Sequence, residues 1–130
     1  MEHCNAVATP VDTKPKPSTS DGKLIDNATS YQSIAGALQY LTLTRLDIAY
    51  TAQQVCLHMH VPWDVHQTML KRILRYIKGT LTLGVQLWAA PTPTITAYSD
   101  ADWVGCPDTR RSTSDFCVFL GSSLISWLSK

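Results

Sequence analysis

Long apolar runs, paired cysteines and charge are all scarce in this 130-residue sequence, and each scarcity excludes a class of protein. No apolar run approaches the roughly 18 residues that a membrane-spanning helix needs. The residues from Glu2 onward are polar, so no signal-peptide core is predicted. The four cysteines form no C-x-x-C pair, which disfavours a disulfide-rich secreted domain and favours reduced thiols in an intracellular protein.

Charge is low but unevenly placed along the chain. Charged residues make up 16% and the net charge is +1, so the chain as a whole carries no nucleic-acid signature. Residues 31–90, however, carry five Lys or Arg against two Asp, whereas each flank is slightly more acidic than basic. The positive charge is therefore concentrated in the middle, where a polyanion would be held. A hydrophobic content of 45% indicates a globular chain with a moderate core.

The first half of the chain predicts a connector followed by two helices. Residues 1–30 are rich in Pro, Ser, Thr and Lys and leave little to bury, which is typical of a connector. Apolar residues at helical spacing then predict a helix from Ser30 to about Leu43. Thr44 is the expected N-cap of a second helix, with Asp47 three residues on. The predicted buried positions are Ile34, Ala37, Leu38 and Leu41 in the first helix and Ile48, Thr51, Ala52 and Val55 in the second.

A third predicted helix has the clearest pattern. Asp64 is expected to cap its start together with Gln67, and Gly79 to end it as the C′ residue. One face is apolar, and a second carries four cations against one Asp. Either the helix is a solvated amphipathic one whose cations favour its negative end, or it contacts phosphates and releases counterions. The apolar positions are Leu70, Ile73, Leu74 and Ile77, and the cations are Lys71, Arg72, Arg75 and Lys78.

Short strands are predicted in the last third of the chain from its β-branched and aromatic residues. Strand 116–120 is apolar on both faces, so it is expected to be central and covered on each side. No covering helix follows it, which predicts an unfinished sheet in a chain that has been cut short. The predicted strands lie at 85–88, 94–99, 116–120 and 124–128, and a tight hairpin at 121–123 joins the last two.

Two carboxylates, Asp100 and Asp102, come where the 94–99 strand is expected to end. Side chains two residues apart on a strand share a face, and carboxylates this close repel one another unless a proton or a hard cation such as Mg²⁺ compensates. The alternative is a solvated acidic turn, because Asp is common in turns. Arg110 and Arg111 follow in the connection to the next strand, where they can hold a phosphate or form a solvated turn.

Cys56, His58 and His60, with His66 further on, suggest a zinc site. In a helix, however, only Cys56 and His60 of the first three share a face. Structural zinc sites need four convergent ligands, so no zinc is expected here.

The motifs around these residues resemble one family. The segment AYSDADWVGCPDTRRSTS at 97–114, followed by CVFLG at 117–121 and ISW at 125–127, resembles the start of the ribonuclease H domain in copia-type LTR retrotransposon polyproteins. Upstream, YQSIAGALQYLTLTR at 31–45, DIAY at 47–50 and KRILRYIKGT at 71–80 are similar to the segment that closes the reverse transcriptase of the same polyproteins. The order and spacing follow the family. The sequence departs from it at Leu46, where proline is usual, and at Asp115, where glycine is usual.

The resemblance implies an α+β fold in three parts. Residues 1–30 would be a flexible connector after the polymerase palm, residues 31–90 a three-helix thumb/connection segment, and residues 91–130 an incomplete ribonuclease H-like sheet of about three strands. The family site holds two divalent ions, Mg²⁺ or Mn²⁺, that cut RNA paired to DNA. By position Asp100 matches the first metal ligand, and Asp102 would support it. The other acidic ligands would follow Lys130, so the chain alone is expected to be catalytically incomplete and not to bind the metal stably.

Three functions are open on this basis. The chain is a piece of a polyprotein that performs RNA-directed DNA synthesis and RNA–DNA hybrid hydrolysis, a nucleic-acid-binding piece that uses its cationic helix, or a decayed remnant without selected activity. The expected partners are an RNA–DNA hybrid or primer–template duplex and the remainder of the Pol polyprotein, with no membrane. The expected location is intracellular, in a cytoplasmic particle or the nucleus.

Overall fold

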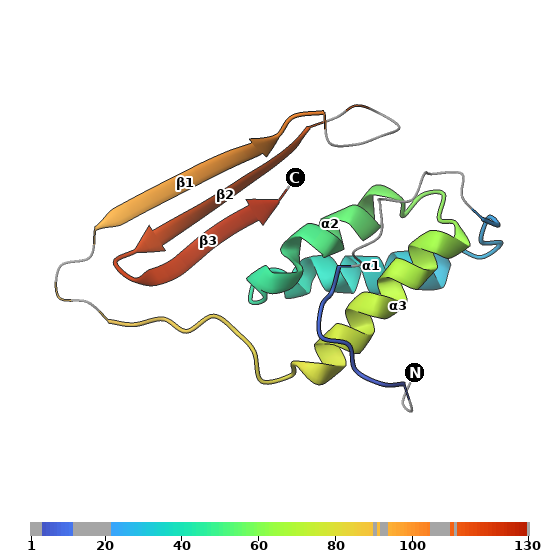
Figure 1. Ribbon diagram of the computed structural model, residues 1–130, viewed down its shortest axis with the longest axis horizontal. Coiled ribbons are helices and arrows are strands. Elements are labelled where there is room, and N and C mark those ends of the chain that lie inside the picture. The colour runs from blue at the N-terminus through green and yellow to red at the C-terminus, as the bar shows by residue number, and fades with distance from the viewer. Residues whose placement is uncertain are drawn as a thin grey trace.

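The computed structural model places three α-helices beside a three-stranded antiparallel sheet in the part of the chain that it describes (Figure 1). It describes residues 4–11, 22–89, 91, 94–104, 110 and 112–129. The α+β class predicted from the sequence is therefore confirmed. The elements are α1 (Thr29–Leu41), the 3-10 helix η1 (Leu46–Ile48), α2 (Ala49–Leu57), α3 (Asp64–Gly79), β1 (Ile95–Asp102), β2 (Thr113–Leu120) and β3 (Ser123–Ser129).

The hydrophobic core lies between the three helices. All three helices contribute to it, because periodic apolar residues bury one face of each helix. In α3, Leu70 and Ile73 are buried while Leu74 and Ile77 pack at the edge of the core. The buried core residues are Tyr31, Ala35, Leu38, Ile48, Ala52, Val55, Leu70, Ile73 and Tyr76.

In α1 the buried stripe differs from the predicted one. Ala37 is exposed, whereas Tyr31 and Ala35 face the core together with the predicted Leu38. The Tyr31 hydroxyl donates a hydrogen bond to the carbonyl of Val55 in α2 (2.8 Å). Burial of this hydroxyl raises the pKa of Tyr31. A buried tyrosine needs such a partner, and the partner lies outside the helix itself, so helical periodicity alone does not reveal it.

The predicted cap at Thr44 is wrong. The Thr44 hydroxyl donates back to the carbonyl of Leu41 (3.2 Å), and the chain enters η1 from Arg45 without a side-chain cap. Asp47 is used differently, because both of its carboxylate oxygens accept from Arg45. Pairing with a buried cation has displaced the expected capping role.

The predicted cap at Asp64 is wrong as well. Helix α3 begins at Asp64 itself, and Trp63 is the residue before its first turn. The Nδ1 atom of His66 accepts from the backbone N–H of Trp63 (3.0 Å), so a histidine ring rather than Gln67 reaches back to the start of the helix. The backbone N–H of Asp64 donates to Lys23 (2.9 Å), which ties the incoming chain to this end of α3.

The sheet is a simple meander in the order β1-β2-β3. β2 is central, as predicted, and a two-residue turn at Gly121 and Ser122 joins it to β3. Gly121 has φ of +60°, a conformation that glycine adopts without strain. β1 continues through Asp102, so the acidic pair lies inside the strand and not beyond its end. The predicted strand at 85–88 is not a strand, and that segment runs extended between helices and sheet.

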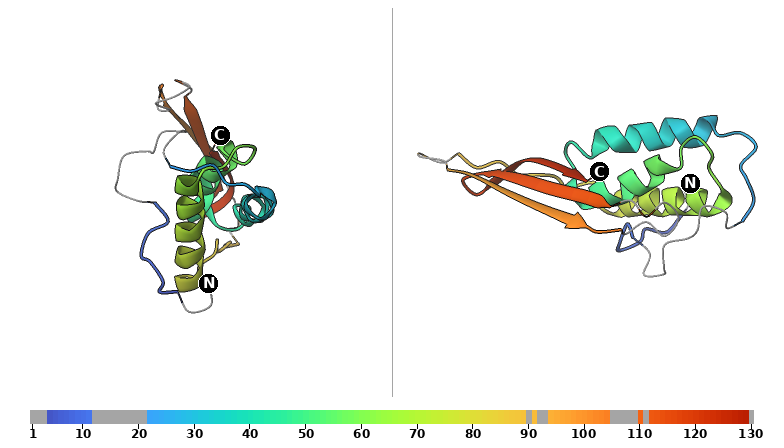
Figure 2. Two further views of the ribbon diagram at one scale, coloured as in Figure 1. Left: turned by 90° about the vertical axis from the view of Figure 1, so that its right-hand side faces the viewer. Right: turned by 90° about the horizontal axis from the view of Figure 1, so that it is seen from above.

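The sheet joins the helices along β3, which packs against α2 (Figures 1 and 2). The indole N–H of Trp127 donates to the carbonyl of Thr42 after α1 (2.7 Å). The Ser123 hydroxyl bonds both the N–H and the carbonyl of Trp88, at 2.7 and 3.2 Å, and so fastens the incoming segment to the sheet. Phe116 of β2 is 40% exposed, so the described chain does not provide the expected cover on both faces. No described helix has the length and apolar character needed to cross a membrane.

Candidate nucleic-acid interface and acidic strand

The cations of α3 lie on one side of a sixteen-residue helix whose other side is buried. Lys71 and Lys78 are exposed, and Arg72 and Arg75 are half-buried. Residues three apart on a helix are neighbours, so Arg72, Arg75 and Lys78 form a row beside the apolar stripe. The row is a little under two helical turns long. The helix is regular because its interior contains no proline or glycine before Gly79.

An amino-terminal strap, residues 4–11, lies along this row (Figure 2). Residues 4–11 belong to the segment predicted as a connector, but the cations hold them through their backbone oxygens. Val7 also packs against the edge of the core. The contacts are Arg72 Nε to Val11 O (3.1 Å), Arg72 Nη2 to Thr9 Oγ1 (3.1 Å), Arg75 Nε to Asn5 O (2.7 Å) and Lys78 Nζ to Cys4 O (3.1 Å).

Gly79 has a different role from the one predicted. It is the last residue of α3 and is not among the glycines with positive φ, so it is not a C′ residue. A methyl group at position 79 would lie 2.8 Å from Cβ of Ala6 in the strap. Gly79 is therefore what allows the strap to approach the end of the helix closely.

Arg45 is the cation that sequence reasoning missed. Its side chain is 5% exposed, and it pairs with Asp47 through Nη2 at 2.7 Å and Nε at 2.9 Å. It also donates to the carbonyl and hydroxyl of Thr80 beyond α3, and its guanidinium lies 5.8 Å from the Tyr76 ring centre. The hydrogen bond from Arg45 lowers the pKa of Asp47, and hydrogen bonding to Asp47 raises the pKa of Tyr76. This cation stabilises the helical unit and is not available to a ligand.

The acidic residues Asp100 and Asp102 lie side by side on one face of β1, as the alternation of a strand requires. Both are exposed, and Oδ1 of Asp100 accepts from the N–H of Ala101 (2.8 Å). Asp115 of β2 stands directly opposite Asp100 in the register, within a regular strand. A shallow depression lies at this point, lined by Ser99, Asp100, Ala101, Ser114, Asp115, Phe116 and Leu128.

These carboxylates do not by themselves fit a divalent metal site. Within the described residues no group of three or more His, Cys, Asp or Glu side chains is placed to hold a metal ion. Mg²⁺ demands nearly octahedral oxygen coordination, and here one oxygen of Asp100 already accepts a backbone hydrogen bond. The described residues alone therefore supply too few ligands for Mg²⁺.

The remaining sequence candidates are dispersed. Arg110 is exposed with φ of +57°, and Arg111 lies outside the described residues. His58 stacks on His66 with ring centres 3.8 Å apart, and Cys56 Sγ contacts the carbonyl of Ala35. The pKa of His66 is lowered to about 4, chiefly because the ring is buried and also because His58 lies beside it. These groups do not converge on a common ligand position among the described residues.

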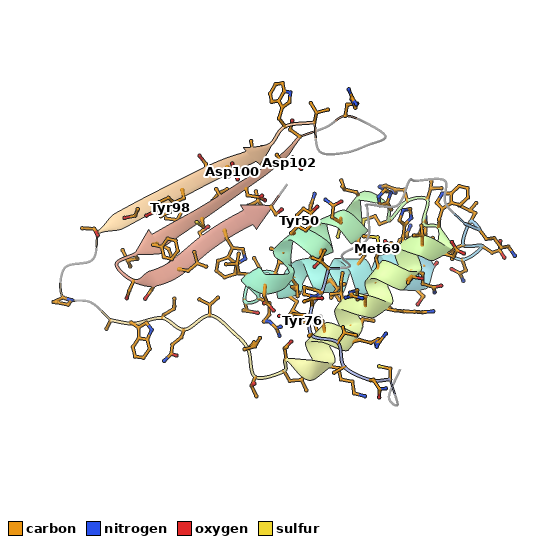
Figure 3. The ribbon with its side chains drawn as sticks, viewed as in Figure 1. Tyr50, Met69, Tyr76, Tyr98, Asp100 and Asp102 are labelled. Atoms are coloured by element: carbon orange, nitrogen blue, oxygen red, sulfur yellow. The ribbon has the colours of Figure 1, made fainter. Side chains whose placement is uncertain are left out.

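The acidic strand and the cationic helix are separate features of the molecule. Figure 3 shows Asp100 and Asp102 on β1, while Tyr76 marks α3 among the helices. β2 lies between β1 and β3, and β3 is the strand that packs against α2. One ligand would have to span the width of the sheet to meet both. The sequence had given no signal of the strap or of the burial of Arg45, because both depend on partners far along the chain.

Comparison with known proteins shows what the chain is similar to. The uncharacterized mitochondrial protein AtMg00810 of Arabidopsis thaliana is 45% identical over 130 residues, which cover 100% of this chain and 54% of that protein. The retrovirus-related Pol polyprotein from transposon RE2 of the same plant is 44% identical over 124 residues, 95% of this chain and 8% of the polyprotein. Secreted RxLR effector protein 161 of Plasmopara viticola is 40% identical over 101 residues, 77% of this chain and 71% of that protein.

The chain thus spans about half the length of the first of these relatives and less than a tenth of the polyprotein. It matches no protein-family model. No solved structure matches it either.

Proposed function

This chain belongs to the retrovirus-related Pol polyproteins of copia-type retrotransposons, and from that premise we propose that it supplies a duplex-binding surface to RNA-directed DNA synthesis and hybrid hydrolysis. In this proposal residues 31–90 act as the thumb/connection segment, residues 91–130 begin the ribonuclease H domain, and residues 1–30 link them to the polymerase palm. The ligand is an RNA–DNA hybrid or a primer–template duplex. The other partner is the remainder of the polyprotein.

The observation that carries the proposal is the row of cations on α3. Arg72, Arg75 and Lys78 donate to backbone oxygens of the strap, which places the three side chains in one row along the helix. Lys71 adds an exposed charge on the same helix. Cations repeated along a helix can follow a phosphate backbone, and each phosphate they neutralise releases counterions. Arg110 and Arg111 would add contacts from the β1–β2 connection.

The acidic strand has a conditional role in this proposal. Asp100 would supply one carboxylate, and Asp102 a supporting one, to a Mg²⁺ or Mn²⁺ site that needs further ligands from the rest of the polyprotein. Without those ligands the chain binds a hybrid but does not cleave it. The proposed setting is intracellular, in a cytoplasmic particle or the nucleus, where the free thiols of Cys4, Cys56 and Cys117 would stay reduced.

The test is the salt dependence of binding to a labelled 20-base-pair RNA–DNA hybrid. We expect Lys71→Glu and Arg75→Glu each to weaken binding about tenfold and to reduce the slope of log K against log salt by about one or two. Among the described residues Lys71 makes no hydrogen bond to residues 4–11, so Lys71→Glu probes the charge without disturbing the strap. Lys23→Glu is the matched control, because it makes the same change of charge on an exposed residue away from the cationic row.

Equal weakening by all three variants would mean that only net charge matters, and the proposed interface would be wrong. Undiminished binding by Arg75→Glu would have the same consequence. A hybrid that does not bind at any salt concentration would remove the nucleic-acid function altogether.

A further inference from the structure

The strap occupies the atoms that the proposed interface needs. Its backbone oxygens accept from Arg72, Arg75 and Lys78, which are three of the four cations on α3. The strap runs antiparallel to the helix, because Val11 meets Arg72 and Cys4 meets Lys78 at the other end. It therefore lies along the row and accepts a hydrogen bond from each of its three cations.

The strap is held by more than these hydrogen bonds. Val7 packs against the edge of the core, and Ala6 sits over Gly79 where a side chain at 79 would collide with it. Glycine at this position costs helix propensity relative to alanine, so its presence favours close approach of the strap over stability of the helix itself. Both the strap and α3 therefore contain residues that favour their contact.

The strap and a nucleic acid offer different acceptor groups to the cations of α3. A peptide carbonyl is a neutral acceptor, whereas a phosphodiester oxygen carries charge and forms a stronger bond with guanidinium and ammonium groups. A phosphate backbone can therefore compete for these donors, but only after the strap oxygens have released them. If the strap is docked most of the time, only a fraction of the molecules have a free row. The apparent affinity for nucleic acid is then the intrinsic affinity multiplied by that fraction.

We propose that the amino-terminal strap is an autoinhibitory segment that competes with nucleic acid for the cations of α3. This inference rests on the proposed function, since it concerns the regulation of the same surface. Binding of a duplex would displace residues 4–11 from the helix. Any interaction that draws the strap away would open the row of cations to nucleic acid.

The experiment exploits the contact between Gly79 and Ala6. In the full chain, Gly79→Ala adds a methyl group that pushes the strap away and leaves every cation in place, and alanine suits a helix better than glycine. The double variant Gly79→Ala with Ala6→Gly removes the colliding methyl group and restores the space. Ala6→Gly alone completes the cycle. All four chains are tested with the labelled hybrid at 0.1 M NaCl, and limited proteolysis within residues 4–11 is followed with and without hybrid.

We expect Gly79→Ala to bind the hybrid about three- to tenfold more tightly than the unchanged chain does. The affinity of the double variant should lie within about twofold of that of the unchanged chain. The strap should lose protection from proteolysis in Gly79→Ala, and in the unchanged chain when it is saturated with hybrid. Unchanged affinity of Gly79→Ala, or strap protection that survives saturation, would overturn the inference. If Lys71→Glu still weakens binding in that case, the proposed interface stands and only the competition fails. If no chain binds, both are wrong.

Discussion

Arg45 and Thr80 are held together by two hydrogen bonds, from Nη1 to the carbonyl at 2.9 Å and from Nη2 to the hydroxyl at 2.7 Å. Arg45 lies between α1 and η1, and Thr80 follows α3, so the pair ties the α1–η1 connection to the end of α3. Asp47 supplies the opposite charge that allows a guanidinium to be buried at this position. A buried cation held on two sides is a point where one substitution should have a large effect.

Arg45→Ala should lower the free energy of unfolding by about 3 kcal/mol, because it leaves Asp47 and Thr80 without their donor. Arg45→Lys should recover only part of this, since an ammonium group cannot reproduce the forked geometry. Urea denaturation measures both. Lys71→Ala, which removes an exposed cation from α3, should change stability by less than about 0.5 kcal/mol. Similar losses in Arg45→Ala and Lys71→Ala would show that burial of the pair adds nothing.

His66 should make the fold sensitive to acid. Its pKa is about 4 in the folded chain against 6.5 for an ordinary histidine, because its ring is buried and stacked on His58. Its Nε2 atom is buried and has no hydrogen-bond partner among the residues that the structure describes. Between these two pKa values the unfolded chain binds more protons than the folded one, so stability is lost as the pH falls. We expect a loss of about 2 kcal/mol between pH 6.5 and pH 4.

Denaturation midpoints in urea at several pH values in this window measure the loss. His66→Phe keeps a ring against His58 but cannot be protonated. Its stability at pH 7 should be somewhat lower, because Trp63 loses its acceptor, but the slope between pH 6.5 and pH 4 should flatten. An unaltered slope in His66→Phe would assign the acid sensitivity to other groups.

Trp127→Phe should loosen the junction between sheet and helices. The substitution keeps an aromatic ring but removes the N–H that donates to Thr42. The expected cost is about 1 kcal/mol, which corresponds to a fall of about 4 °C in Tm for a chain of this size. Trp103→Phe is the matched control because Trp103 is 84% exposed. Equal shifts in the two variants would mean that the indole bond to Thr42 contributes no stability.

The chain by itself should not cleave an RNA–DNA hybrid in the presence of Mg²⁺. The reason is the ligand set, since two neighbouring carboxylates on one strand cannot fix two ions that demand octahedral geometry. Gel analysis of a labelled hybrid should show no more product with the unchanged chain than with Asp100→Asn, against a complete ribonuclease H as positive control. Cleavage that disappears in Asp100→Asn would instead show that the chain assembles a working site.

Local patterns predicted the features that depend on local physics. The stripe Ile48, Thr51, Ala52 and Val55 is buried as predicted, because helical periodicity reports which face is covered. β2 is the central strand as predicted, although the expected cover on both of its faces is not present in the described chain. The tight turn at Gly121 followed from glycine chemistry. The family resemblance, carried by the segment around Asp100 and by the helix ending at Gly79, is confirmed by the Pol polyprotein relatives.

The features that sequence reasoning missed all depend on distant partners. Asp47 has the spacing of a cap but pairs with Arg45, and Gly79 has the position of a C′ residue but makes room for Ala6. In each case a contact outside the helix decides the role, and no periodicity within the helix encodes it. The cations of α3 were recognised from sequence, whereas the strap that holds them was not, because its contacts use backbone oxygens that every residue possesses.

The free side of β1 has a consequence for the behaviour of the chain at high concentration. In the described residues β1 pairs only with β2, so the N–H and C=O groups along its outer side form an open template to which another strand can add. Two copies that pair antiparallel through this edge, centred on Ala101, would place Asp100 of each copy opposite Asp102 of the other, and like charges directly opposite are unfavourable. The carboxylates that mark the candidate site therefore also disfavour this edge-to-edge pairing of two identical chains.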